Sequence, residues 1–190
     1  MLRHGFKAEA ERIAAEGRSE LGLAMTDALD AHALADHLGI PLVALSTVST
    51  ARDGAGFVAF FRVVDPESFS ALTIFNATAR MIVHNDAHHP HRQASNICHE
   101  VAHCLLEHPP APLLGDGGCR ERNETIEAEA DWLGGALLVP REGGLSLIKR
   151  DWPVQRIADH YGVSESLCRW RLNNTGVVRH AERLAQRRRG

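Results

Sequence analysis

The residues best suited to chemistry in this 190-residue chain lie in the pentapeptide His99-Glu100-Val101-Ala102-His103. On an α-helix, positions four apart stack on one face, so both imidazoles can offer a ring nitrogen to a single cation. Glu100 lies beside them, within reach of a water on that cation. We interpret the pentapeptide as an HExxH zinc motif, with His99 and His103 as metal ligands and Glu100 as the catalytic base. The alternative is a polar helix face that only meets water.

A catalytic zinc site takes a third protein ligand and keeps a fourth position open. The next predicted helix carries Glu127 and Asp131 four residues apart, on one face. One carboxylate can ligate zinc while the other accepts the free ring N–H of a ligating histidine. Glu127 is the favoured third ligand and Glu129 the alternative, and we expect Asp131 to orient a histidine. Gly134 and the glycine after it permit close approach of the histidine helix.

The elements that must position these side chains follow from hydrophobic spacing. Helices are predicted over 6–19, 30–38, 90–107 and 123–139, and short apolar runs predict strands at 41–45, 56–64, 71–75 and 81–84. The last two strands form a hairpin through 76–80. The Gly143-Gly144 pair is interpreted as a hinge into a small helical unit. The pattern predicts an α+β fold with a small mixed or antiparallel sheet, a main domain over 1–142 and a helical subdomain over 145–190.

In the predicted zinc helix, one arc is apolar and is expected to face the core; it comprises Ala94, Ile97, Val101, Cys104 and Leu105. Cys98 also points to this side, so we expect the thiols of Cys98 and Cys104 to be small core groups. Four cysteines without a CxxC pair indicate reduced thiols. The chain lacks an apolar run of about 20 residues and a secretory signal. We therefore expect a cytoplasmic protein with no membrane segment.

The strand predicted at 81–84 is a candidate sheet edge, to which an extended substrate could add by backbone hydrogen bonds; the alternative is an ordinary interior strand. His84 and Tyr161 are candidate oxyanion donors, and both types of side chain are more often structural. Four histidines gather in one turn-rich stretch: His84, His88, His89 and His91. They lack ligand spacing, so we expect a solvated loop and not a second metal site.

With these residues in view, the sequence resembles the ImmA/IrrE family of zinc metallopeptidases. The resemblance spans most of the chain and is carried by five segments: 8–45, 93–106, 126–140, 157–164 and 169–176. It implies a zincin-like domain with a helix-turn-helix-like C-terminal extension. It also implies zinc held by His99, His103 and Glu127, with Glu100 as the base. One departure is Trp132-Leu-Gly-Gly-Ala, where the commoner family text is closer to Phe-Ala-Ala; this bears on packing and not on the ligands.

The resemblance further implies site-specific cleavage of a helix-turn-helix repressor, often one encoded nearby. In some family members such pairs act as toxin and antitoxin. A zinc-binding regulatory or toxin-type protein that binds its partner without proteolysis is therefore the alternative function. DNA binding through 154–173, with Arg169 and Arg171 on the second helix, is a further alternative. It is not favoured because the net charge is -3 and no basic field covers the chain.

Overall fold

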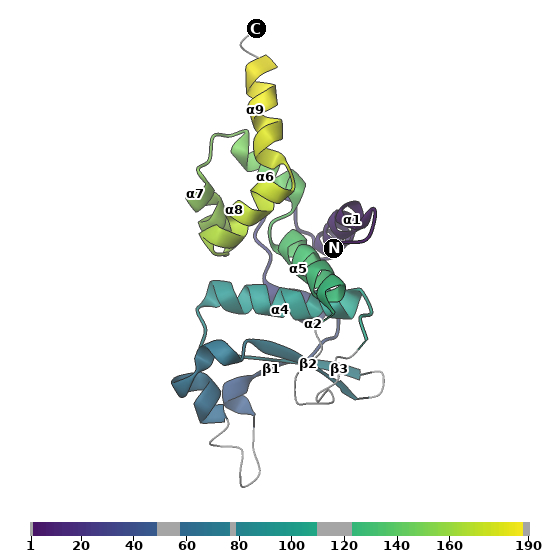
Figure 1. Cartoon of the computed structure of the whole chain (residues 1–190), viewed down its shortest axis with the longest axis vertical. Coiled ribbons are helices and arrows are strands. Elements are labelled where there is room, and N and C mark those ends of the chain that lie inside the picture. The colour runs from purple at the N-terminus through teal and green to yellow at the C-terminus, as the bar shows by residue number, and fades with distance from the viewer. Residues whose placement is uncertain (1, 49–57, 77–78, 110–122, 188–190) are drawn as a thin grey trace.

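The computed structural model describes residues 2–48, 58–76, 79–109 and 123–187 (Figure 1). Its elements, in chain order, are α1 (Phe6–Glu20), α2 (Ala31–His37), β1 (Leu42–Ala44), η1 (Leu45–Thr47), η2 (Phe60–Val64), η3 (Pro66–Ser68), β2 (Ala71–Asn76), β3 (Ala79–His84), α4 (Pro90–Leu105), α5 (Glu124–Leu138), α6 (Arg141–Ile148), α7 (Val154–Tyr161), α8 (Glu165–Asn174) and α9 (Val177–Arg187). Helices dominate, and the predicted α+β class is confirmed.

The described strands form one mixed sheet in the order β1-β3-β2. β1 runs parallel to β3, with Leu42 opposite Ile82, and β2 runs antiparallel to β3, with Thr73 opposite the same residue. The predicted hairpin is therefore confirmed. The prediction that the strand at 81–84 is a sheet edge is wrong, because β3 is the interior strand. Its apolar residues Ile82 and Val83 are 0% and 8% exposed, which is the burial expected for a central strand.

The strand predicted at 56–64 is also wrong over the part that the structure describes. Residues 58–64 are helical and end in the π-helical turn η2, and 56–57 lie outside the described residues. Apolar runs of this length do not distinguish a strand from a helix by periodicity. Here the side chain of the fully buried Asn85 donates to the carbonyl of Phe61 at 2.9 Å, which holds the helical turn against the start of the next loop.

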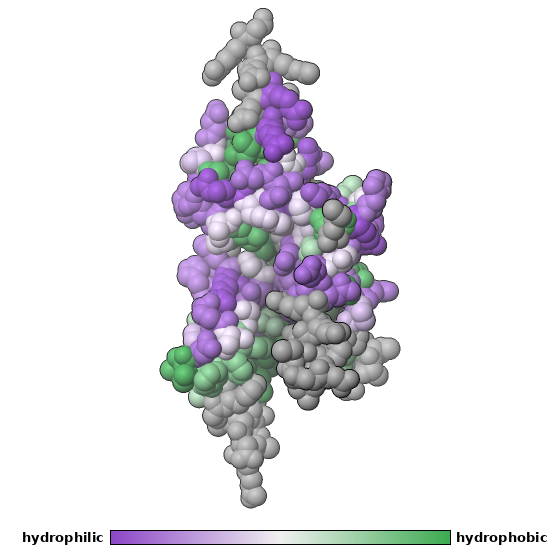
Figure 2. All heavy atoms as spheres, in the orientation of Figure 1, coloured by the Kyte–Doolittle hydropathy of each residue, from purple (hydrophilic) through white to green (hydrophobic). Residues whose placement is uncertain are grey.

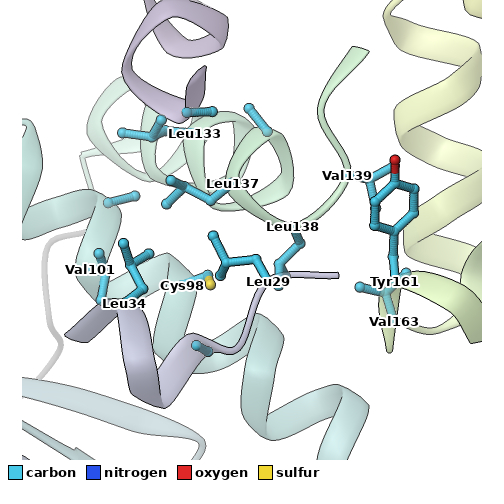
Figure 3. Close-up of a cluster of buried hydrophobic side chains, with 14 of the residues drawn as sticks. Leu29, Leu34, Cys98, Val101, Leu133, Leu137, Leu138, Val139, Tyr161 and Val163 are labelled. Carbon is cyan, nitrogen blue, oxygen red and sulfur yellow. The ribbon is translucent and has the colours of Figure 1, made fainter. Parts of the chain in front are cut away.

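The core lies between α4 and the helices stacked on it. In Figure 1, α4 crosses the sheet on one side and meets α5 on the other, and α1 packs on α5 in turn. The predicted core face of α4 is confirmed, since Ile97, Cys98 and Val101 are 0% exposed and Cys104 is 7% exposed. Figure 3 shows side chains from α4 and α5 converging in this layer, including Leu133 and those labelled at positions 98, 101, 137 and 138. Each fully buried leucine or valine in this layer stabilises the fold by about 1.5–3 kcal/mol.

A buried arginine joins α1 to the end of α5. The last carbonyls of any helix have no partner within it. Arg18 is 0% exposed, and its Nη2 donates to the carbonyls of Leu137 and Leu138 at 2.9 and 3.2 Å. Its Nη1 donates to the carbonyls of Ala24 and Asp27. This single side chain therefore satisfies carbonyls at the end of α5 and holds the segment that leads into α2.

The C-terminal helices do not follow a hinge. Gly143 and Gly144 lie inside α6, and a Cβ on Gly143 would lie 2.0 Å from the carbonyl oxygen of Met25 and 2.3 Å from Oη of Tyr161. The hinge interpretation is therefore wrong: these glycines let α6 pack directly against neighbouring segments. α7 and α8 form the predicted helix-turn-helix-like pair around Gly162, which has φ 64°. The division at 142–145 stays a prediction, and it falls within α6.

Hydrophilic and hydrophobic residues gather over different parts of the surface. Figure 2 shows mostly hydrophilic residues over the C-terminal helices, with hydrophobic surface gathered near the sheet and η2. The exposed large hydrophobic residues of η2 and β2 are Phe60, Val63, Val64 and Ile74. None of the helices in the described ranges combines the length and the apolar character that a membrane span requires.

Candidate metal centre

Two imidazoles project side by side from the C-terminal half of α4. The helix begins after His89, whose side chain accepts from the backbone N–H of His91, and Pro90 occupies the first helical position. Ten residues further along, His99 and His103 lie one turn apart with their Nε2 atoms 3.1 Å from each other. Their ring centroids are 4.7 Å apart and the rings are inclined by 72°. Two ring lone pairs converge at this distance only when a proton or a cation lies between them.

The third candidate metal ligand comes from the start of α5. Asn123 caps this helix by accepting from two backbone N–H groups. Glu127 then places its Oε2 3.6 Å from Nε2 of His99 and its Oε1 3.8 Å from Nε2 of His103. Donor atoms of the three residues lie within 4.8 Å of one another. Ligands about 2.0–2.2 Å from a tetrahedral zinc ion are roughly 3.3–3.6 Å apart, and two histidines with one glutamate form a known catalytic ligand set. The donors present therefore fit zinc.

The crossing of the two helices depends on Gly134. A Cβ at this position would lie 3.2 Å from the backbone C and O of Cys98 and from the N of His99. The predicted close approach of the two helices is thus confirmed at Gly134. Glu127, Asp131 and Gly134 recur at helical spacing, so the same face of α5 carries the contact and the carboxylates.

Asp131 lies behind the first histidine. Its Oδ1 is 2.9 Å from Nδ1 of His99, so the ring donates to the carboxylate and turns its Nε2 toward Glu127. Burial disfavours a charged His99, but the hydrogen bond and negative charge of Asp131 outweigh it, and the pKa of His99 is raised above 6.5. The structure therefore places Asp131 against Nδ1 of His99, and its role in orienting that histidine stays a prediction.

A second set of residues lies behind His103, and sequence reasoning missed its main member. Nδ1 of His108 is 2.9 Å from Nδ1 of His103, and Nε2 of His108 is 3.6 Å from Oε2 of Glu129. Oε1 of Glu129 is in turn 3.2 Å from Nε of Arg3. Burial lowers the pKa of His108, although Glu129 opposes the shift. Glu129, the alternative third ligand, thus faces His108 and is not among the three converging donors. No local pattern marks His108.

Glu100 is anchored from the sheet. Oγ1 of Thr73 donates to its Oε2 at 2.6 Å, across the gap between β2 and α4. The hydroxyl therefore fixes one carboxylate oxygen of Glu100 toward β2. Thr73 also escaped sequence reasoning, because a threonine in a strand is usually just a strand former.

A model of peptidase family M78, described as the IrrE N-terminal-like domain, matches residues 35–173, from α2 into α8. This span covers most of the chain and contains every residue of the converging donor set. The chain belongs to this family. The resemblance to ImmA/IrrE peptidases is therefore confirmed, together with a zincin-like domain and a metallopeptidase type of function that implies a metal. A search of curated proteins found no match.

Other residues singled out in the sequence lie elsewhere in this family member. His84 and His88 are 4% and 7% exposed, so the predicted solvated loop is wrong for both. His84 packs edge-on against His32, and Nε2 of His88 lies 2.7 Å from the carbonyl oxygen of Pro66. Burial, with His32 adding to it, lowers the pKa of His84. Tyr161 donates to the carbonyl of Met25, which is a packing role. Within the described residues, the single group of three or more close metal-ligating side chains is His99, His103 and Glu127.

Proposed function

We propose that this protein is a zinc-dependent endopeptidase that cleaves a helix-turn-helix repressor at a specific site. In this proposal His99, His103 and Glu127 hold zinc and Glu100 is the catalytic base. The observation that carries it is the convergence of two Nε2 atoms and one carboxylate, at distances of 3.1, 3.6 and 3.8 Å, from two crossing helices. Membership of a peptidase family supports the reaction type. A repressor substrate would place the reaction in the cytoplasm.

The ligands, Glu100 and Asp131 would have separate roles in the reaction. Zinc, when bound by two histidines and one glutamate, supplies Lewis acidity that lowers the pKa of a water to about 7 and polarises a carbonyl. Glu100 takes a proton at Oε1, the oxygen to which Thr73 does not donate, and returns it to the departing amine. Asp131 keeps the proton of His99 on Nδ1, so that Nε2 stays unprotonated and its lone pair can bind the metal.

An extended substrate would add to the outer side of β2. In the described parts of the chain, β2 pairs on one side only, with β3, and so presents unpaired backbone groups. The same strand carries Thr73, which contacts the proposed base, and Ile74, which is 41% exposed. Backbone pairing along β2 would therefore place a peptide next to Glu100. This edge replaces β3, which the sheet order makes interior.

DNA binding finds less support in the arrangement of the C-terminal helices. Arg171 is one of the two arginines that the sequence offers for DNA contact on the second helix, but it is 1% exposed. Its guanidinium donates to Oε1 of Glu11 at 2.6 Å and to the carbonyl of Val139, and it lies 5.2 Å from the ring of Trp132. Phosphate contacts need accessible cations. We therefore keep a protein substrate as the proposed partner.

The test uses the full chain loaded with one equivalent of zinc and a purified helix-turn-helix repressor encoded beside its gene. We expect the wild type to produce one pair of fragments and Glu100→Gln to produce none while retaining its zinc. Glu124→Gln, the same change on an exposed residue at the start of α5, is the control and should cleave normally. Binding of the repressor without cleavage would favour the regulatory alternative, and cleavage by Glu100→Gln would exclude Glu100 as the base.

A further inference from the structure

The end of α4 folds back in a way that brings one more histidine onto the metal ligands. The N–H of His108 donates to the carbonyl of His103 at 3.0 Å, and the N–H of Glu107 donates to that of Cys104 at 3.2 Å. These two bonds form a Schellman motif, in which the residue after the left-handed position lies against the residue five positions before it. Glu107 occupies the left-handed position with φ 53°. Glycine usually fills this position, so the turn is held in spite of its side chain.

The motif places the ring of His108 against the ring of His103. Their centroids are 5.0 Å apart, and the two Nδ1 atoms face each other at 2.9 Å. Two nitrogens at this distance share one proton, because two N–H groups would repel and two lone pairs would also repel. If Nε2 of His103 carries the metal, its proton is on Nδ1, so His108 must accept there. The proton of His108 then lies on Nε2, the nitrogen that faces Glu129.

We propose that His108 is a positioning residue that holds His103 in the Nδ1–H tautomer, with its Nε2 turned to the metal, and that Glu129 fixes the tautomer of His108. The inference rests on the proposed metal site. It extends that site by a second route of support, separate from Asp131. The side chains of His108 and Glu129 are 8% and 9% exposed, whereas that of Asp131 is 65% exposed. The support behind His103 is therefore shielded from water, and that behind His99 is not.

The first test measures zinc affinity of the full chain by competition with a chromophoric chelator. His108→Leu should weaken zinc binding roughly 10- to 100-fold, the usual effect of losing a partner behind a ligating histidine. His108→Asn retains an acceptor near Nδ1 and should lose less. His84→Leu is the matched control, since it removes an imidazole of similar burial that packs on His32, and it should bind zinc as the wild type does. Circular dichroism of each variant confirms that the fold is retained.

The second test needs no substitution and so is independent of folding. Long-range ¹H–¹⁵N spectra of the zinc-loaded wild type report which ring nitrogen of each histidine is protonated. We expect His103 to carry its proton on Nδ1 and His108 on Nε2. A proton on Nδ1 of His108, or wild-type affinity in His108→Leu, would overturn the positioning role while leaving the metal site intact. Failure of the wild type to bind zinc at all would instead remove the proposed function, and this inference with it.

Discussion

Adding one methyl group at Gly134 should weaken the metal site more than it weakens the fold. The new Cβ would lie 3.2 Å from three backbone atoms of α4, at Cys98 and His99. Non-bonded carbon contacts are optimal at about 3.5–4.0 Å, so the helices must separate by about 0.3 Å or more. Backbone atoms cannot turn aside as a flexible side chain can, and the displacement is therefore transmitted along α5 to Glu127.

Two opposing terms set the magnitude for stability. Replacing glycine by alanine inside a helix stabilises the folded protein by about 1 kcal/mol, because alanine has the higher helix propensity. Overpacking of a close contact costs about 1–3 kcal/mol. Gly134→Ala should therefore range from no net change to a loss of about 2 kcal/mol in the free energy of unfolding. Zinc affinity has no such compensation. The 3.6 and 3.8 Å distances from Glu127 to the two histidines should lengthen by about 0.3 Å or more, which uses most of the roughly 0.5 Å within which ligand geometry must be held, so we expect a loss of roughly three- to tenfold.

The chain supplies a matched control at Gly17, inside α1. A Cβ there would meet only Cδ1 of Leu34, at an ordinary 3.8 Å. Gly17→Ala should therefore stabilise the protein by about 0.5–1 kcal/mol and leave zinc affinity unchanged. Urea unfolding of the metal-free proteins and chelator competition measure the two quantities. The reasoning fails if Gly134→Ala is stabilised as much as Gly17→Ala and also binds zinc as tightly as the wild type.

Three further predictions follow from contacts away from the metal donors. Gly143→Ala should lower the free energy of unfolding by about 3 kcal/mol or more, because its Cβ would overlap the carbonyl of Met25; unchanged stability in urea would restore the hinge interpretation. Thr73→Val should lower kcat about tenfold through loss of a hydrogen bond to a charged carboxylate while zinc affinity stays constant; a parallel loss of zinc would contradict a role confined to Glu100. The pKa of His84 is lowered from 6.5 by burial, so the unfolded chain binds that proton first. Its contribution to stability is complete above pH 6.5 and declines as the pH falls toward the lower, folded pKa. The stability difference between wild type and His84→Leu in urea should therefore change with pH below 6.5 and be flat above it, and a flat difference throughout would refute the shift.

The parts of the site that could be predicted are those governed by local geometry. His99 and His103 had to share a face once α4 was a helix, because the α-helical period alone sets their separation. The apolar arc with Ile97 and Val101 follows from the same period. Strands β2 and β3 were predictable as a hairpin, since their separation is short and their residues favour strands.

The parts that could not be predicted depend on contacts between distant segments. The order of strands placed β3 inside the sheet, although nothing local distinguishes an interior strand of this length from an edge. Thr73 reached Glu100 only through the packing of β2 beneath α4. His108 joined the site because a left-handed Glu107 reversed the chain. The Gly143-Gly144 pair is typical of a hinge in the sequence, but Gly143 lies in a helix that is tightly packed against neighbouring segments.

The choice between Glu127 and Glu129 as the proposed third ligand depends on both the sequence and the tertiary structure. The amino-acid sequence determined that a helix with several carboxylates follows the two histidines, and that Glu127 and Gly134 lie two turns apart on one face. Glu127 and Glu129 point in directions that differ by about 200° around the helix axis. Only the rotation of α5 about its own axis selects between them, and that rotation is set where Gly134 meets the backbone of α4. A contact between two helices, which is invisible in either one alone, therefore decided which carboxylate faces the metal site and which faces His108.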